Sequence, residues 1–467
     1  MRTTKIICTL GPATESPEML RELIRAGANI FRLNMSHARH DWVREVVRRI
    51  RAISDELQTV TAILLDTQGP AIRTGDLQRS LDLKPGDIFE FTVRGSRSEE
   101  HYSVDVNYDG LIDDISVGDT VLVDNGVMHM KVLEKNNNRI RCEVLTAGTL
   151  GSRRHINLPG VKVNLPPLTP KDLADIELGA SVGVDFVALS FCREASDIEE
   201  LKTRLAELGS TAKVIAKIED QEAVRNVNSI IRASDSVMIA RGDLGIECRM
   251  EDLPIIQRRI IKKCIRFGRP VIVATHMLES MIENPLPTRA EITDVANAVF
   301  EQADAIMLSG ETTVGKYPIE CVKVLDRVAR RIAETGGAGY AAAAIIDTTR
   351  LKTMKSGITL ANSFTNAKLV VFTRRGFMAQ HAAQLRPERA PIFAFTPNQE
   401  VVRQLQLNWN THPIQMPFGI DPDHTIADAE RELLQRGLIA KGDHLIVLSD
   451  VMAGHERFDS IQLRVVA

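Results

Sequence analysis

A lysine and two carboxylates stand at the ends of two short apolar runs, where they could bind a metal ion and a phosphate together. Lys217 and Glu219 end the run AKVIAKIE, and Asp243 ends the run SVMIARGD. Side chains two residues apart in a strand point to the same side, so Lys217 and Glu219 would be neighbours. Carboxylates without a histidine beside them are typical ligands of a hard cation such as Mg²⁺.

Other apolar runs end in polar residues in the same way. The further residues that could serve a site are Arg32, Asn34 and Ser36, then Asp66 and Thr67 with Arg73 shortly after, then Thr275 and His276, and finally Ser309 to Glu311. Arginine and lysine side chains suit phosphate groups. The sequence shows no Ser-His-Asp or Cys-His arrangement for acyl transfer. Clustered cations with a metal ion indicate phosphoryl transfer, in which the protein chiefly positions groups and neutralises charge.

Gly242, next to Asp243, lies where a strand is expected to turn into a helix. A glycine at such a turn lets backbone N–H groups approach an anion closely, at the positive end of a helix. A cradle for a carboxylate or phosphate is one interpretation of this glycine, and a plain turn glycine is the other.

These residues must be positioned by strands, and eight apolar runs alternate with amphipathic helical patterns. The runs cover residues 5–11, 29–35, 61–67, 184–190, 212–218, 235–241, 269–276 and 303–310. Eight strand–helix units predict an α/β protein with a (β/α)₈ TIM barrel, whose chemistry belongs at the carboxyl ends of the strands. An open doubly wound sheet is the alternative.

The alternation is interrupted once and resumes after a linker. Residues 70–164 show strand and turn patterns only, which predicts an all-β lid domain inserted after the third barrel strand. The stretch GGAGYAAAA is a predicted linker, and strand and helix patterns alternate again behind it. We therefore expect a catalytic barrel over 1–69 and 165–337, an inserted β-barrel lid over 70–164 and a C-terminal α/β domain of the effector type over 338–467.

The composition bounds the class of protein. The chain has 467 residues with a net charge of −3, which argues against a general nucleic-acid binder. Its six cysteines form no CxxC pair and support neither a disulfide framework nor a zinc site, so a cytoplasmic location is expected. No apolar run reaches the length of a signal peptide or a membrane span, and no membrane partner is expected.

Several stretches together resemble the pyruvate kinase family. They are CTLGPAT, FRLNMSH, LLDTQGPAIRTG, INLPGVKVNLP, AKIEDQEAV, MIARGDLGIE, ATHMLESMIENPLPTRAEITDVANAV and IMLSGETTVGKYP, and they extend to about residue 318. The resemblance implies a homotetrameric enzyme that transfers a phosphoryl group from phosphoenolpyruvate to ADP. It also implies that the products are ATP and enolpyruvate, which is then protonated to pyruvate.

The resemblance implies roles for individual residues. Glu219 and Asp243 would hold Mg²⁺ or Mn²⁺, Lys217 would stabilise the phosphoryl group in transfer, and Thr275 would lie near the methylene carbon that is protonated. Backbone amides at Gly242 and Asp243 would bind the substrate carboxylate, with Arg32, Lys217 and Thr275 as further substrate contacts. The nucleotide side would comprise Pro12, Arg32, Asn34, His37, Arg73 and Arg154, and the potassium ligands would be Asn34, Ser36, Asp66 and Thr67. Arg73 and Ser309 complete the expected catalytic set.

The sequence departs from the usual family pattern at a few positions. Gln68 and Ala71 replace the common lysine and glutamate, and the missing acid leaves potassium dependence open although the four ligands are present. His276 stands where glutamine is usual, either as a titratable group or as a simple hydrogen-bonding substitute. Phe377 and Met378 replace small hydroxyl residues in the effector loop, so a response to fructose 1,6-bisphosphate is not expected. Arg154 keeps the charge, but not the geometry, of the usual lysine.

Two other functions compete with an active pyruvate kinase. A magnesium-dependent aldolase on a related barrel also binds pyruvate enolate with two acids, but it would not need the lid, Arg73 or Lys217. A non-catalytic or regulatory paralogue would account for Gln68 and Ala71. It would be expected to have lost some of the site residues, however, and all of them are present.

Overall fold

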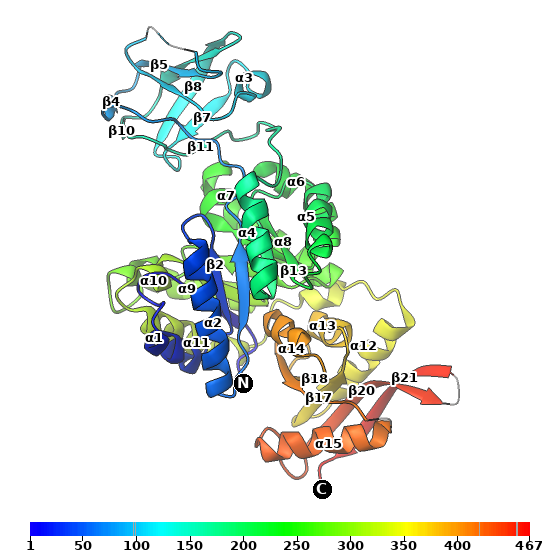
Figure 1. The fold of residues 1–467 in the computed structure, drawn as a ribbon. Helices are drawn as coiled ribbons and strands as arrows, with labels where there is room; N and C mark the ends of the chain where they lie inside the picture. Colours follow the sequence, from blue (N-terminus) through cyan, green and yellow to red (C-terminus); the bar gives the residue numbers. More distant parts are fainter. Residues whose placement is uncertain (97, 99, 420, 454–455) are drawn as a thin grey trace.

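The computed structural model describes all residues except 97, 99, 420 and 454–455. Eight parallel strands form a closed barrel at the centre of the molecule (Figure 1). They are β1 (Lys5–Thr9), β2 (Ile30–Asn34), β3 (Ala62–Asp66), β12 (Phe186–Leu189), β13 (Lys213–Ile218), β14 (Ser236–Ala240), β15 (Val271–Ala274) and β16 (Ala305–Leu308). The predicted TIM barrel is confirmed, and the open-sheet alternative is wrong.

Helices surround the barrel and follow its strands. They are α1 (Pro17–Ala26), α2 (His40–Glu56), α4 (Pro170–Val182), α5 (Ala195–Glu207), α6 (Gln221–Ala233), α7 (Arg241–Glu247), α8 (Leu253–Phe267), α9 (Arg289–Phe300), α10 (Gly310–Thr313) and α11 (Pro318–Ala333). Helix α4 shows why they begin where they do. The Thr169 side chain accepts from the Asp172 amide and the Asp172 side chain caps the Thr169 backbone, so two otherwise unpaired N–H groups are satisfied.

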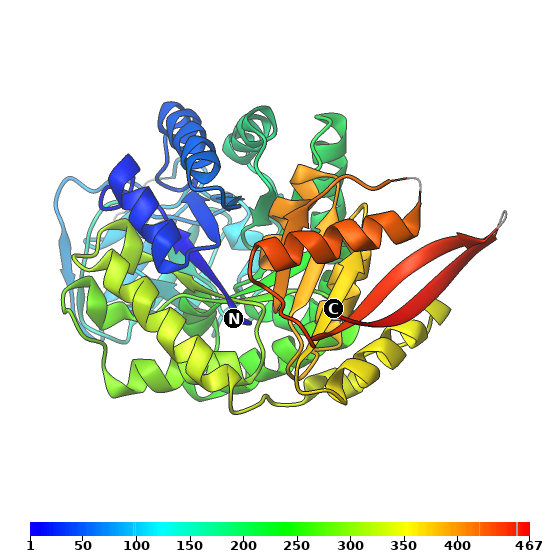
Figure 2. The ribbon, with the colours of Figure 1, turned by 90° about the horizontal axis from the view of Figure 1, so that it is seen from below.

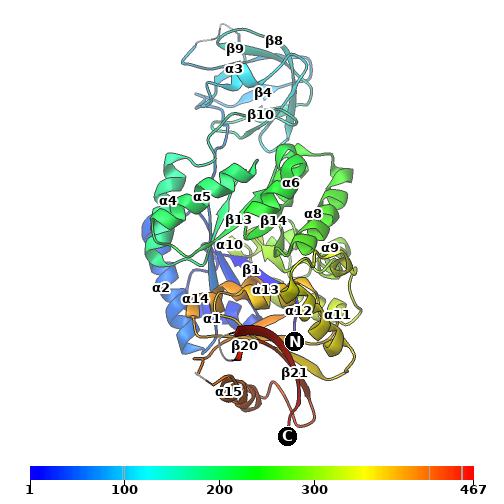
Figure 3. The ribbon, with the colours of Figure 1, turned by 90° about the vertical axis from the view of Figure 1, so that its right-hand side faces the viewer.

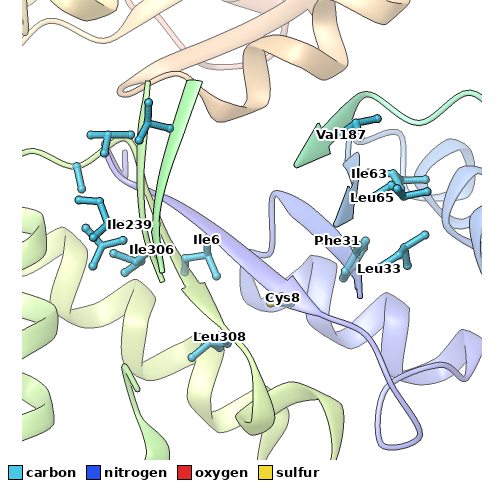
Figure 4. Packing of buried hydrophobic residues seen from close by; sticks show 14 of the residues in the cluster. Ile6, Cys8, Phe31, Leu33, Ile63, Leu65, Val187, Ile239, Ile306 and Leu308 are labelled. Atoms are coloured by element: carbon cyan, nitrogen blue, oxygen red, sulfur yellow. The ribbon is translucent and has the colours of Figure 1, made fainter. Parts of the chain in front are cut away.

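The two faces of each barrel strand pack against different cores. Outward-facing residues such as Ile6, Phe31 and Ile63 are buried against the helices (Figure 4). The alternate positions form a separate cluster inside the barrel, to which Leu407 of the C-terminal part also belongs. Because the interior is filled with aliphatic side chains, polar groups at its carboxyl end are held on a rigid base.

The lid, residues 70–164, stands at the opposite end of the barrel from the C-terminal part (Figures 1 and 3). Its strands are β4 (Leu81–Leu83), β5 (Ile88–Thr92), β6 (Ser103–Asp105), β7 (Thr120–Val123), β8 (Met128–Lys135), β9 (Arg139–Val144), β10 (Gly148–Leu150) and β11 (Ile156–Asn157). They form a six-stranded sheet and a two-stranded pair around their own buried core. The prediction of strands and turns alone was wrong at one helical turn, α3 (Leu111–Asp114). This turn buries the neighbouring residues Leu111 and Ile112 together, whereas a strand would point them to opposite faces.

The C-terminal part is built on a five-stranded sheet (Figure 2). In spatial order its strands are β19 (Thr411–Gln415), β18 (Ile392–Thr396), β17 (Ala367–Phe372), β20 (His444–Ala453) and β21 (Glu456–Val465), the last antiparallel. Its helices are α12 (Thr349–Asn362), α13 (Phe377–Gln384), α14 (Gln399–Gln404) and α15 (Pro422–Gln435). The α/β class is confirmed. The apolar runs KLVVFT, PIFAFT and HLIVLS predict β17, β18 and β20, whereas the segments of β19 and β21 lack a continuous apolar run and were not predicted.

The linker packs on the barrel, because Tyr340 and Ala341 are half-buried against its outer core. The exact domain boundaries stay predictions. Among the described residues, no helix has the length and apolar character that crossing a bilayer requires. All six cysteines are free thiols.

Candidate functional site

The polar residues at the strand ends continue the inward-facing rows of the barrel. Ile30, Leu64 and Ile215 face the interior. Arg32, Asp66 and Lys217 lie two residues further along the same strands, so they follow on the same face. The inner rows therefore change from aliphatic to charged at the carboxyl end of the barrel, where the sequence predicted a site.

Lys217 is the centre of this charged layer. Its buried Nζ lies 2.9 Å from Glu219 Oε1 and 3.2 Å from Asp66 Oδ1, and it donates to Ser190 Oγ at 2.7 Å. Burial alone would lower the pKa of Lys217, but the carboxylates of Asp66 and Glu219 hold it above its usual value. Lys217 is therefore a fixed positive charge rather than a base.

Glu219 is an almost fully buried carboxyl that lacks sufficient compensating charge. Its Oε2 accepts the Phe191 amide at 2.6 Å. Burial raises the pKa of Glu219 to about 7, and the negative charge of Asp243 adds to the rise against the opposing effect of Lys217. A cation beside Glu219 and Asp243 would relieve this cost of burying charge.

The two carboxylates fit a divalent metal ion. Glu219 and Asp243 line one cavity, and their oxygen donors are the kind that Mg²⁺ prefers. Within the described part of the chain, no group of three or more His, Cys, Asp or Glu side chains is arranged as a metal cluster. Mg²⁺ commonly takes one or two carboxylates and completes its shell with water and substrate oxygens, so two protein ligands suffice.

Asp66 is enclosed between two cations. Arg32 Nε lies 2.6 Å from Asp66 Oδ2, and Lys217 approaches Oδ1. Burial would raise the pKa of Asp66, but Lys217 and Arg32 together hold it below its usual value. Arg32 also donates from Nη1 to Thr9 Oγ1 at 3.1 Å. Arg32 is thus locked in place at the mouth of the barrel.

The predicted potassium ligands lie at or just after the ends of the paired strands β2 and β3, but several of their oxygens already have partners. Asn34 Oδ1 accepts the Ser36 amide at 3.2 Å. Thr67 Oγ1 donates to the Ala188 carbonyl and accepts the Ser190 amide, each at 3.1 Å.

Helix α7 begins directly after β14 and carries Gly242 and Asp243. The Gly242 N–H donates to Thr275 Oγ1 at 2.7 Å, so the amide expected to bind a substrate carboxylate is engaged by a hydroxyl in this structure. A Cβ built on Gly242 would lie 3.5 Å from Thr275 Oγ1 and 3.7 Å from His276 Cε1. These are ordinary contacts at an ordinary φ, so local crowding does not explain the glycine, whereas an approaching ligand would.

Thr275 and His276 have an unusual backbone. Their φ angles are 68° and 53°, in the left-handed region that β-branched residues such as threonine rarely adopt. The Thr275 hydroxyl also donates to the Ala274 carbonyl at 2.6 Å. Strain of this kind persists only where surrounding contacts enforce it and is concentrated at functional sites.

Arg241 supplies those contacts. It is buried and donates from Nη2 to the Thr275 carbonyl at 2.6 Å and from Nε to the Ala274 carbonyl at 3.2 Å. Its Nη1 lies 2.7 Å from Asp294. Arg241 therefore braces the end of β15 and holds Thr275 in position.

The remaining predicted residues line two adjoining cavities that share Arg32 and Asn34. A cavity of about 340 Å³ contains the metal-type carboxylates with Ser36, Thr67, Arg73 and Arg154. A second, of about 630 Å³, is lined by Pro12, His37 and Ser309 among others. The structure thus gathers the predicted residues at one end of the barrel but divides them between two spaces.

The lid contributes its own charges to the first cavity. Arg154 Nη1 lies 3.2 Å from Asp124 Oδ1, and Arg73 donates from Nη1 to the Arg153 carbonyl at 3.2 Å. Arg154 and Arg73 are both exposed, so both remain accessible to a phosphate group.

At the end of β16 only part of the polar run faces a cavity. Ser309 Oγ is buried without a hydrogen-bond partner among the described residues, beside the larger cavity. Glu311, grouped with the strand-end residues from sequence, is fully buried and accepts the amides of Ser309 at 2.7 Å and Leu278 at 3.0 Å. Glu311 therefore shapes the loop and does not face a cavity.

Several residues that line the site cavity were not predicted from the sequence, and three of them show why. Ser190 ends the fourth barrel strand and touches Lys217, and Phe191 has a φ of 53° and presents its amide to Glu219. A serine at the end of the run VDFVALS was the available signal for the first. His155 lines the site cavity from the lid, and nothing in its sequence context pointed there.

Comparisons with known proteins agree with this geometry. The family model "Pyruvate kinase, barrel domain" matches residues 1–322, and "Pyruvate kinase, alpha/beta domain" matches residues 352–463. Plastidial pyruvate kinase 2 of Arabidopsis thaliana is 41% identical over 451 residues, covering 96% of this chain and 78% of the relative. The pyruvate kinase of Geobacillus stearothermophilus is 40% identical over 471 residues, covering 97% and 78%.

A solved structure gives the same result. The crystal structure of a pyruvate kinase from Cryptosporidium parvum superimposes with a TM-score of 0.94 at 33% identity, covering 100% of this chain and 96% of that one. With two family models that together span most of the chain and relatives at about 40% identity along nearly all of it, the chain belongs to the pyruvate kinase family.

Proposed function

We propose that this chain transfers the phosphoryl group of phosphoenolpyruvate to ADP at the site centred on Lys217. The observation that carries the proposal is the position of Lys217, held between Asp66 and Glu219 at the mouth of the barrel beside Asp243. A fixed cation next to two metal-type carboxylates is what a transferring phosphoryl group requires, since its charge is spread over three oxygens. The aldolase and the non-catalytic paralogue have no comparable support.

The protein side chains would act mainly by position and charge. Lys217 and Arg32 would neutralise phosphoryl oxygens as the bond to the enol oxygen breaks and the bond to the ADP β-phosphate forms. Arg73 and Arg154 would approach the nucleotide phosphates from the lid. Thr275, held in place by Arg241, would lie near the methylene carbon, where a proton is added to give pyruvate.

Glu219 and Asp243 would hold a divalent metal ion, Mg²⁺ or Mn²⁺. The bound ion would supply positive charge beside the phosphoryl and enolate oxygens. Enzymes of this family depend on a metal ion, and the choice of metal belongs to the proposal. The substrate carboxylate would approach Gly242, in the space that a side chain there would occupy.

The larger cavity would take the nucleotide. Pro12 and His37 line it, and Arg32 and Asn34 join it to the phosphoryl site. Ser309 contributes a hydroxyl that has no hydrogen-bond partner in the described part of the chain. Its volume of about 630 Å³ is within the range of small-molecule sites.

A potassium site at Asn34, Ser36, Asp66 and Thr67 stays a prediction, because Asp66 already pairs with Arg32 and Lys217. The homotetramer, the cytoplasmic location and the absence of a fructose 1,6-bisphosphate response are predictions as well. For the last, Phe377 begins α13 with its ring about half exposed, where a phosphate would need donors.

The experiment that tests the function is the formation of pyruvate from phosphoenolpyruvate, ADP and Mg²⁺, with potassium titrated from zero. We expect pyruvate and ATP to appear in equal amounts and only when all three are present. Steep activation by potassium would show that the four proposed potassium ligands suffice without an acidic residue at position 71. Full activity without potassium would identify a potassium-independent enzyme, and no pyruvate under either condition would contradict the proposal.

A further inference from the structure

Helix α7 is the part of the barrel that the lid touches next to the site. Asn157, in β11 where the lid returns to the barrel, donates from Nδ2 to Glu247 Oε1 at 3.0 Å. At a second point, a Cβ built on Gly126 of the lid would lie 3.2 Å from Cγ2 of Ile246. Glu247 and Ile246 are the last two residues of α7.

The other end of the same helix carries the site. Asp243 is a proposed metal ligand, and the Gly242 amide is bonded to Thr275. With only seven residues, α7 is about two turns long, so its two ends cannot move independently. A displacement of Glu247 by the lid would therefore reach Asp243.

The contact between Asn157 and Glu247 is buried and incompletely satisfied. Asn157 is 4% exposed and Glu247 is 9% exposed. Asn157 Oδ1 has no hydrogen-bond partner among the described residues. Both side chains line a cavity of about 70 Å³ between the lid and the barrel, which also borders Asp220 and Arg193. A buried carbonyl oxygen without a partner is costly, so this arrangement is poised to rearrange when the lid moves.

We infer that the hydrogen bond between Asn157 and Glu247 couples the position of the lid to the metal and substrate site through α7. The inference rests on the proposed function, because it takes Asp243 as a metal ligand. By reciprocity, ligands bound on the barrel side must then alter the mobility of the lid. Asn157 and Glu247 act as positioning residues, since neither lines the 340 Å³ cavity.

The electrostatics of Glu247 agree with this role. Burial, as the largest cause, raises the pKa of Glu247 to about 7 against the effect of the Asn157 hydrogen bond, and the charges of Asp220 and Asp243 add to the rise. Arg193 and Arg225 also face the cavity, and Glu222 completes its charged lining. A glutamine at 247 resembles the protonated acid, and its amide could donate to Asn157 Oδ1.

The test measures two responses to Mn²⁺ and phosphoenolpyruvate in the full chain: Mn²⁺ binding, from the free-ion signal, and amide hydrogen exchange in the lid. In the unaltered protein we expect the ligands to slow exchange in lid segments 120–130 and 150–163 by about fivefold or more, a typical size for coupling between sites. In Asn157→Ala and in Glu247→Ala, the ligands should slow exchange in these segments by about twofold or less. Mn²⁺ affinity should change by no more than the coupling factor that is lost, because the metal ligands themselves are intact and the coupling is reciprocal.

Two variants serve as matched controls. Glu247→Gln should keep the lid response, because it can still accept the Asn157 amide. Lys162→Gln breaks a different contact between lid and barrel, 3.1 Å from Glu194 and 3.6 Å from Glu222, and should leave the response unchanged. The double variant Asn157→Ala with Glu247→Ala should lose no more than either single variant, as expected for two residues that act as one pair.

The outcomes separate the inference from the proposed function. A full lid response in both alanine variants would overturn the inference, and so would a loss in Lys162→Gln as large as in the alanine variants. Preserved Mn²⁺ binding in the same proteins would show that the metal site itself is intact. Absence of a lid response in the unaltered protein would also overturn it. Failure of the unaltered protein to bind Mn²⁺ would contradict the proposed metal site itself, and the inference would fall with it.

Discussion

Lys217→Met is expected to abolish phosphoryl transfer while proton exchange at the methyl group of pyruvate stays measurable. The ammonium of Lys217 is a buried fixed cation that an apolar side chain of similar length cannot replace. Loss of one donor aimed at developing charge typically costs ~10²–10³ in rate, and a full charge in a buried site places this variant at or above that range. Proton exchange requires the enolate and the metal site but no phosphoryl group.

The Lys217→Met experiment needs a variant that still folds and a control substitution of another lysine. Asp66 keeps Arg32 as its partner when Lys217 is lost, so the barrel mouth retains one of its buried ion pairs. Lys202 lies on the outer helix α5, with its Nζ 3.5 Å from Asp235 Oδ1. Lys202→Met should keep full activity. Equal loss of both reactions in a Lys217→Met protein with an unchanged melting temperature would show that the role assigned to Lys217 is wrong.

Glu219→Gln is expected to weaken use of the metal ion in both half-reactions. The substitution keeps the shape and removes the negative charge, so one of the two proposed metal ligands would become neutral. Loss of a side chain that hydrogen-bonds to a metal ligand typically lowers metal affinity about 10–100-fold. For loss of a ligand's charge we expect at least this rise in the Mg²⁺ concentration needed for half-maximal phosphoryl transfer and proton exchange. A Mg²⁺ titration of each reaction measures the effect.

The pH dependence gives this prediction a second readout. Because the pKa of Glu219 is raised to about 7, its protonated form gains population as the pH falls through 7. The proton then competes with the metal, so metal affinity of the unaltered protein should decline below neutral pH, and that decline should flatten in Glu219→Gln. Glu177→Gln, which alters a carboxylate paired with Arg204 on the outer helices, should change neither property. An unchanged Mg²⁺ titration in Glu219→Gln would contradict the metal site.

Much of the barrel could be predicted from sequence because its strands are buried on both faces. Such strands appear as continuous apolar runs between amphipathic helices, and all eight were recognised. Strand β19 (THPIQ) and helix α3 (LIDD) have no such pattern, since their conformation depends on neighbouring elements. Short segments of this kind are decided by tertiary packing rather than by local propensity.

The candidate site was predictable where a polar residue ends an apolar run. It was less predictable where side chains bind backbone amides and carbonyls. Lys217, Glu219 and Asp66 continue strand rows, so their faces could be derived from alternation. The structure alone reveals that Arg241 braces the Thr275 carbonyl and that Glu311 turns inward to bind amides. Composition and spacing do not give the direction in which a side chain points at the turn that follows a strand.

The left-handed backbone at Phe191, Thr275 and His276 illustrates the same limit. Phenylalanine and threonine rarely adopt positive φ, and histidine does so only somewhat more often, so no sequence rule would have placed these three residues there. Each follows a barrel strand. A hydrogen bond from Arg241 holds the Thr275 carbonyl, and the Phe191 amide donates to Glu219. A site assembled from several strand ends therefore has a predictable chemistry and a less predictable geometry.

A crystal structure with Mn²⁺ and phosphoenolpyruvate, in which anomalous scattering locates the metal, would show directly whether these strand ends form one site. We expect an anomalous peak bound by carboxylate oxygens of Glu219 and Asp243, with the phosphoryl group beside Lys217. A peak at any other position, or a phosphoryl group bound away from Lys217, would contradict the claim that these strand ends form one phosphoryl-transfer site.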